Sequence, residues 1–143
     1  MISRQNTTWS GRNAVSEASV LSDRIDVIER GYEYLLAYAA QGRQDDAGTE
    51  LRDTLARMHE ALGGMQGLVH KVFGGSPDSA GVSHFMDAVE RDVQVARGAL
   101  GLVLSRERIG SLLVDNLNAS VHVRALLTDL FLVEQALKSG VQP

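Results

Sequence analysis

Apolar residues recur alternately three and four positions apart in four stretches of this 143-residue chain. Such spacing keeps an apolar stripe on one side of an α-helix, where a neighbouring helix can cover it. Four stripes of this kind predict an all-α fold, either an antiparallel four-helix bundle or a dimer of long helical hairpins. The series are Leu21/Ile25/Ile28/Tyr32/Leu35/Ala39, Leu51/Leu55/Met58/Leu62/Met65/Val69/Val72, Val82/Met86/Val89/Val93/Ala96/Leu100/Val103 and Leu112/Asn116/Ala119/Val123/Leu126/Leu130/Val133/Leu137.

The N-terminal residues differ from the rest of the chain. Residues 1–13 are polar and lack periodicity, so they predict a flexible N-terminal arm in front of a single helical-bundle domain over residues 14–140. The arm contains the only tryptophan, Trp9. An exposed indole on a mobile segment is unfavourable, so we expect Trp9 to dock either on its own bundle or on a protein partner.

Capping and helix-breaking residues set the expected boundaries of the first two helices. The first helix should begin near Asn13 or Ser16 and run to Ala40. Two adjacent glycines, Gly63–Gly64, favour a kink or break in the second helix, with a short continuation to Phe73.

The boundary between the last two helices is less sharply marked. Gly74–Asp78 ends the second helix, and the third runs from there to about Leu104. Ser105 could start a tight turn into the fourth helix. A single helix over residues 78–139 is the alternative, and a dimer would then have to cover its apolar stripe.

The composition of the chain indicates which kinds of partner and which cellular location to expect. The net charge is −4 and the basic residues are scattered, which predicts no nucleic-acid partner. The chain has no cysteine and no uninterrupted apolar run of membrane-spanning length, so we expect a cytoplasmic protein with no membrane contact. Arginine far outnumbers lysine, as in proteins from GC-rich bacterial genomes.

Patterns for catalysis or metal binding are missing. A di-metal site inside a helical bundle needs Glu-x-x-His motifs, and the sequence has none. The four histidines contain no i,i+3 or i,i+4 pair, and the glycine-rich segment 63–67 does not follow a strand. We therefore expect no catalytic residues, no metal and no cofactor, and the chain is not predicted to be an enzyme.

His70 is the polar residue with the most specific alternative role. The stretch from His70 to Ser76, followed by Gly81 and Glu90, resembles the motif of histidine phosphotransfer domains. Those domains are helical bundles in which an exposed histidine accepts a phosphoryl group, and small residues after it admit a response regulator. The resemblance implies that His70 is a phosphoacceptor. Phe73 stands where the family carries lysine, and Pro77 interrupts the expected helix.

Polar residues in the most apolar stretch suggest two further roles. Asn116 falls within the apolar series, where a buried amide can fix register and partner choice. Asn118 and His122 are i,i+4 neighbours that could line a small polar pocket.

The leading hypothesis for function is protein–protein interaction by a non-enzymatic regulator, adaptor or assembly factor. The last stretch carries apolar residues outside its main series, enough for a second contact face, and the protein is expected to form a homo-oligomer. These residues are Ile109, Leu113, Leu117, Leu127 and Phe131. The alternatives are phosphotransfer through His70 and ligand sensing through the pocket at Asn118 and His122.

Overall fold

The computed structural model describes the backbone of residues 2–73 and 81–140, and the side chains of residues 17–72 and 81–139. Throughout the described part the regular structure is helical, with no strand, which confirms the all-α prediction. The helices are α1 (Ile2–Ala39), α2 (Leu51–Leu62), α3 (Met65–Phe73), α4 (Val82–Leu104), α5 (Ser111–Ala119) and α6 (His122–Gly140).

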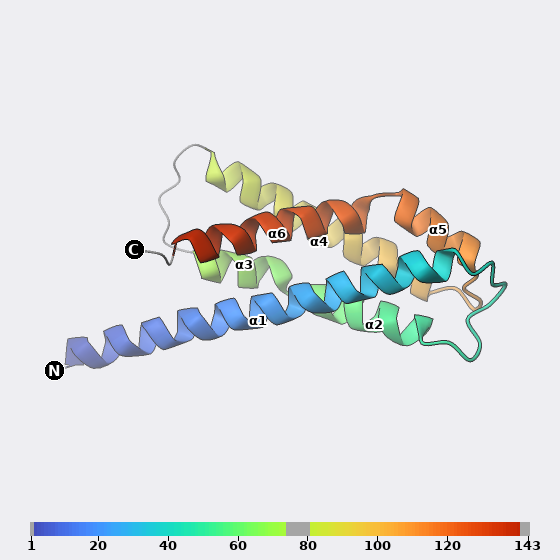
Figure 1. Ribbon diagram of the computed structural model, residues 1–143. Coiled ribbons are helices and arrows are strands. Elements are labelled where there is room, and N and C mark those ends of the chain that lie inside the picture. Colours follow the sequence, from blue (N-terminus) through green and yellow to red (C-terminus); the bar gives the residue numbers. More distant parts are fainter. Residues whose placement is uncertain (1, 74–80, 141–143) are drawn as a thin grey trace.

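Helix α1 begins much earlier than expected. It starts at Ile2, so the predicted start near Asn13 or Ser16 is wrong and the segment 2–13 is helical. No proline interrupts this segment, and each residue added to an existing helix gains a backbone hydrogen bond without a new nucleation cost. Figure 1 shows this end of α1 extending past the ends of the other helices. Trp9 lies within it, and its side chain is outside the described residues.

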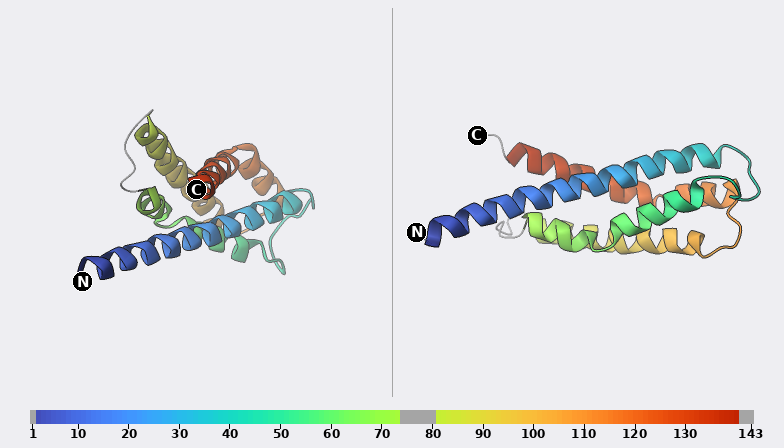
Figure 2. Two further views of the ribbon diagram at one scale, coloured as in Figure 1. Left: turned by 60° about the vertical axis from the view of Figure 1, so that its left-hand side comes forward. Right: turned by 90° about the horizontal axis from the view of Figure 1, so that it is seen from below.

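The helices are arranged around one core. Helices α1 and α4 each pack against both α2–α3 and α5–α6. Figure 1 shows successive long segments running in opposite directions, and the left view of Figure 2 shows α4 inclined to α1. The break at Gly63–Gly64 occurs as predicted, and α3 then continues to Phe73.

Most residues of three of the four apolar series form the core as predicted, but Val82, the first residue of the third series, is 40% exposed and its predicted place in the core is wrong. Leu21, Ile25, Ile28 and Leu35 of α1 are buried, and Met86 to Val103 of α4 follow the predicted stripe. From α2 and α3, the core includes Leu51, Leu55, Met58, Leu62, Met65 and Val69.

The fourth series is interrupted by a break that the sequence analysis did not anticipate. Val121, between α5 and α6, has a φ of 60°, in the left-handed region that a β-branched residue rarely adopts. Because the break resets the helical phase, α5 buries Val114 and Leu117, whereas Leu112 is 74% exposed. Asn116 and Ala119 are also exposed, so their predicted places in the packed stripe are wrong. After the break, the predicted residues Val123, Leu126, Leu130 and Val133 are buried.

Helices α4 and α5 are separate, so the alternative of one helix over 78–139 is wrong. Ser105 caps the end of α4, and its hydroxyl donates to the carbonyl of Leu102. A connection of six residues then leads to α5 at Ser111. This connection packs against the loop that joins α1 to α2, and the contact fixes one end of the molecule.

Candidate functional site

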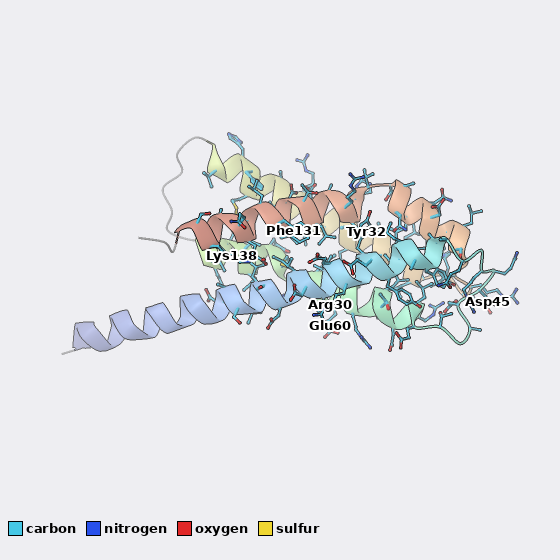
Figure 3. All side chains as sticks on the ribbon, viewed as in Figure 1. Arg30, Tyr32, Asp45, Glu60, Phe131 and Lys138 are labelled. Carbon is cyan, nitrogen blue, oxygen red and sulfur yellow. The ribbon has the colours of Figure 1, made fainter. Side chains whose placement is uncertain are left out.

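Most of the residues predicted to form a second contact face belong to the core. Ile109 is fully buried, and Leu117 and Leu127 are only 6% and 3% exposed. Leu113 is half-buried against the core, while Phe131 on α6 is exposed (Figure 3). The apolar surplus in this part of the sequence is therefore largely taken up by the protein itself, since α5 and α6 present different faces inward.

The two predicted polar sites lie in different surroundings. His70 is exposed on α3, and the small residues expected to follow it lie outside the described residues. Asn118 and His122 fall in different helices, so the i,i+4 relation that joined them does not exist. Asn118 turns towards α1 and donates from Nδ2 to the Leu35 carbonyl at 3.2 Å, whereas His122 is exposed. The predicted polar pocket depended on these two residues sharing one helix face, and they do not share a helix.

Two loops are joined by a network that we call the loop clasp, made by Asp46, Arg52, Ile109 and the end of α4. Arg52 donates to the Asp46 carboxylate at 3.1 Å and to the carbonyls of Leu104, Arg106 and Glu107 at 3.0 to 3.2 Å. The other Asp46 oxygen accepts from the Ile109 amide at 3.0 Å. Burial works against ionisation, but the hydrogen bonds from Ile109 and Arg52 outweigh it and hold the pKa of Asp46 below its ordinary value.

A second part of the same contact is buried. The Tyr38 hydroxyl donates to the Ile109 carbonyl at 2.6 Å, and the Ser111 hydroxyl donates to the Tyr38 carbonyl at 2.7 Å. Ser111 also accepts from the Arg43 amide at 2.8 Å. Burial raises the pKa of Tyr38. These bonds satisfy polar groups that would otherwise be buried without partners, so they stabilise the contact between the two loop ends.

An acidic pair lies between α4 and α6. Asp92 and Asp129 are both half-buried and lie within hydrogen-bonding reach of each other. The Oδ2 atom of Asp129 is buried and has no donor among the described residues. Burial, together with the Asp92 carboxyl, raises the pKa of Asp129 to about 7.

Apolar side chains flank the acidic pair on the outer surface. Val95 follows Asp92 by three residues and Leu132 follows Asp129 by three, so each lies one turn from the pair and further towards solvent. Val95 is 39% and Leu132 is 61% exposed. We call this surface the α4–α6 seam. Its other exposed members are the small residues Ala88, Ala125 and Ala136 and the cation Arg91.

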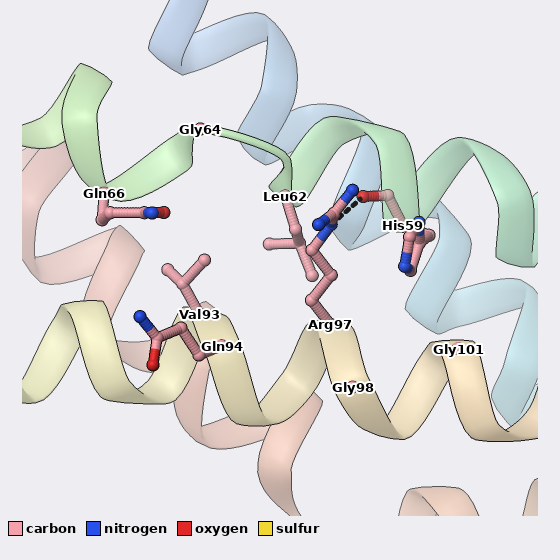
Figure 4. Close-up of a pocket in the computed structure, with 9 residues that line it drawn as sticks. All are labelled: His59, Leu62, Gly64, Gln66, Val93, Gln94, Arg97, Gly98 and Gly101. Atoms are coloured by element: carbon pink, nitrogen blue, oxygen red, sulfur yellow. Dashed lines mark hydrogen bonds between the residues drawn. The ribbon is translucent and has the colours of Figure 1, made fainter.

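A cavity of about 310 Å³ lies where α2 breaks and α3 begins, between these helices and α4 (Figure 4). Arg97 of α4 crosses to α2 here and donates from Nε to the His59 carbonyl at 3.2 Å. Sequence reasoning missed both this cavity and the acidic pair, because each joins residues from helices whose relative placement no spacing rule supplies.

Two classes of site are not formed by the part of the chain that the structure describes. Across residues 2–73 and 81–140, no three histidine, aspartate or glutamate side chains gather as a metal-binding group. Nor does any helix in these ranges have the length and apolar character needed to cross a membrane.

Comparisons with protein-family models, with curated proteins and with solved structures found no match to this chain.

Proposed function

We propose that this protein is non-enzymatic and acts through protein–protein interaction, with the α4–α6 seam as the contact surface and a second copy of the chain as its occupant. The observation that carries the proposal is the exposed apolar seam centred on Val95 and Leu132. We further propose that the fold is an antiparallel four-helix bundle with two interrupted members, supported by the packing of α1 and α4 on both broken segments. A cytoplasmic location is part of the proposal.

The composition of the seam favours helix docking. Alanines at 88, 125 and 136 let the backbone of a partner helix come close, while Val95 and Leu132 provide larger apolar contacts. Docking of this kind removes apolar surface from water, and each square ångström contributes about 25 cal/mol. The apolar centre with a polar margin is typical of the core of a protein interface.

The charges on the seam favour a second copy of the chain over a different partner. Arg91 is exposed on α4 and lies one turn from Val95, beside the acidic pair. In a two-fold symmetric dimer, Arg91 of one protomer can meet the carboxylates of its partner, and the reverse contact forms by symmetry. The same surface thus supplies both the cation and the anions.

Sedimentation velocity over micromolar concentrations tests the proposal. We expect the native protein to dimerise, Leu132→Lys to be monomeric and Arg91→Glu to weaken the dimer at least ten-fold. Leu36→Lys is the matched control, because Leu36 is 47% exposed on α1, outside the seam, and should leave the dimer intact. A native protein that stays monomeric, or a dimer that tolerates Leu132→Lys, would overturn the proposal.

A further inference from the structure

The break between α2 and α3 is held open by two arginines from neighbouring helices. Gly63 ends α2, and its carbonyl accepts from Arg24 Nη1 of α1 at 2.8 Å. Arg97 of α4 donates from Nε to the carbonyl of His59, which lies one turn before Gly63. Gly64 has a φ of +71°, which allows the chain to turn before α3 starts. The carbonyls of His59 and Gly63 at the end of α2 therefore have side-chain partners from neighbouring helices.

The cavity at this break is lined by polar and apolar residues and has no negative charge in its lining. It is lined by His59, Leu62, Gly64, Gln66, Val93, Gln94, Arg97, Gly98 and Gly101. None of these residues is acidic, although the chain carries 18 acidic side chains against 14 basic ones. The charged side chain in this lining is that of Arg97, so the cavity favours an anion over a cation.

The donors in the cavity are arranged around open space. Figure 4 shows Gln66 and Arg97 reaching into the gap from opposite sides, with the His59 ring further along it. The bond from Arg97 Nε to the His59 carbonyl orients the guanidinium, and the two terminal nitrogens keep four N–H groups that can donate. A Cβ atom built on Gly98 would meet no atom within 4 Å, so the missing side chain leaves room there.

Backbone donors add to the side chains. The first intrahelical bond of α3 runs from the Leu68 amide to the Gly64 carbonyl, so the amides of Met65, Gln66 and Gly67 precede the helical ladder. Gly64 and Gln66 line the cavity, which places the start of α3 at its wall. Amides at the start of a helix carry partial positive charge and favour anions.

We propose that the cavity at the α2–α3 break binds the oxyanion group of a small molecule, a carboxylate or a phosphate, through Arg97, Gln66 and His59. The planar guanidinium donates to two oxygens at once, and the glutamine amide and imidazole N–H can donate to the other lone pairs of these oxygens or to a further oxygen of a phosphate. The cavity volume of about 310 Å³ suits a small metabolite. This site is separate from the α4–α6 seam, so either proposal can fail without the other.

Titration of the ¹⁵N-labelled protein by NMR tests the site, with inorganic phosphate and succinate as probes and sodium chloride matching the ionic strength. We expect saturable shifts of the amides of Gln66, Gly67, Gly98 and Gly101 with at least one probe, and no such shifts with chloride. The probe that saturates at lower concentration identifies the oxyanion class.

Three variants separate binding from folding. Arg97→Gln should weaken binding at least ten-fold, whereas Arg124→Gln, on the exposed surface of α6, should leave it unchanged. Gly98→Leu should abolish binding by filling the open space, and should raise the unfolding temperature because leucine favours a helix more than glycine does. Equal shifts in all variants, or shifts scattered over the surface without saturation, would show non-specific ion binding and overturn the proposal.

Discussion

The carboxyl groups of Asp92 and Asp129 face each other across the packed helices α4 and α6. As two carboxylates they would have no donor between them, and the buried Oδ2 of Asp129 has no other donor among the described residues. A single shared proton resolves this conflict, because one carboxyl group then donates to the other. Asp129 therefore holds its proton to a pKa of about 7, against an ordinary value of 3.8.

This pair makes the stability of the fold depend on pH near neutrality. Since the folded-state pKa of Asp129 is raised, its stabilising contribution is fully present below about pH 4 and is lost as the pH rises through 7. We expect Asp129→Asn to be more stable than the native protein at pH 8 by roughly 1–2 kcal/mol, after allowing for solvent screening. Urea unfolding at pH 5 and pH 8 measures this at protein concentrations too low for the proposed dimer, so that Arg91 of a partner does not reach the pair, and the difference should shrink at pH 5. Asp115→Asn, at an exposed position of α5, is the control and should show no pH-dependent gain.

Arg52 should contribute far more to stability than a surface arginine does. Arg52→Ala removes the donor to the Asp46 carboxylate and to three carbonyls, including that of Leu104 at the end of α4. We expect a loss of about 2–3 kcal/mol in the free energy of unfolding, measured by urea denaturation. Arg57 is the matched control, since it pairs only with Asp53 at 3.5 Å on an exposed surface. Arg57→Ala should cost less than about 0.5 kcal/mol, and equal losses in the two variants would argue against the loop clasp.

Val121 should be a site where substitution stabilises the protein. Its φ of 60° is unfavourable for a β-branched residue, whereas asparagine tolerates the left-handed region well. We expect Val121→Asn to raise the free energy of unfolding by about 1 kcal/mol. Val27→Asn tests the reasoning, because Val27 is 38% exposed within helix α1 and should lose stability on the same change. Thermal and urea unfolding of both variants give the comparison. Destabilisation by Val121→Asn would show that the backbone at Val121 is not strained.

His70 provides a direct test of the phosphotransfer alternative. The protein is incubated with a phosphorylated receiver domain, and any transferred phosphoryl group is followed by its acid lability and base stability. We expect no adduct, because Phe73 stands where the resembling family carries a lysine. His84→Gln and His70→Gln are compared, since both histidines are exposed. A robust adduct lost only in His70→Gln would establish phosphotransfer and overturn the proposed non-enzymatic function.

The apolar spacing was enough to predict which sides of the first three helical stretches are buried. Periodicity of this kind depends on local geometry, because residues three and four apart lie on the same side of any α-helix. The break at Gly63–Gly64 was also predictable, since two consecutive glycines weaken a helix wherever they occur. By contrast, nothing in the local sequence marks Val121 as a helix break, and the misplacement of Leu112 and Asn116 follows from that one residue.

The candidate sites were the least predictable part. Asp92 and Asp129 are 37 positions apart, and Arg97 and His59 are 38 apart. No sequence spacing identifies either pair. Each pair forms only because of the axial register and rotation of one helix relative to its neighbour.

The sequence by itself determined that the chain is helical and which stripes are apolar, since both depend on interactions within a few residues. Only the tertiary structure decided that Ile109 and Leu117 are core residues, that Asn118 and His122 are separated, and that two carboxylates share a seam. These outcomes depend on helix phase and register. Both are set by the packing of the whole core, which joins residues far apart in the sequence.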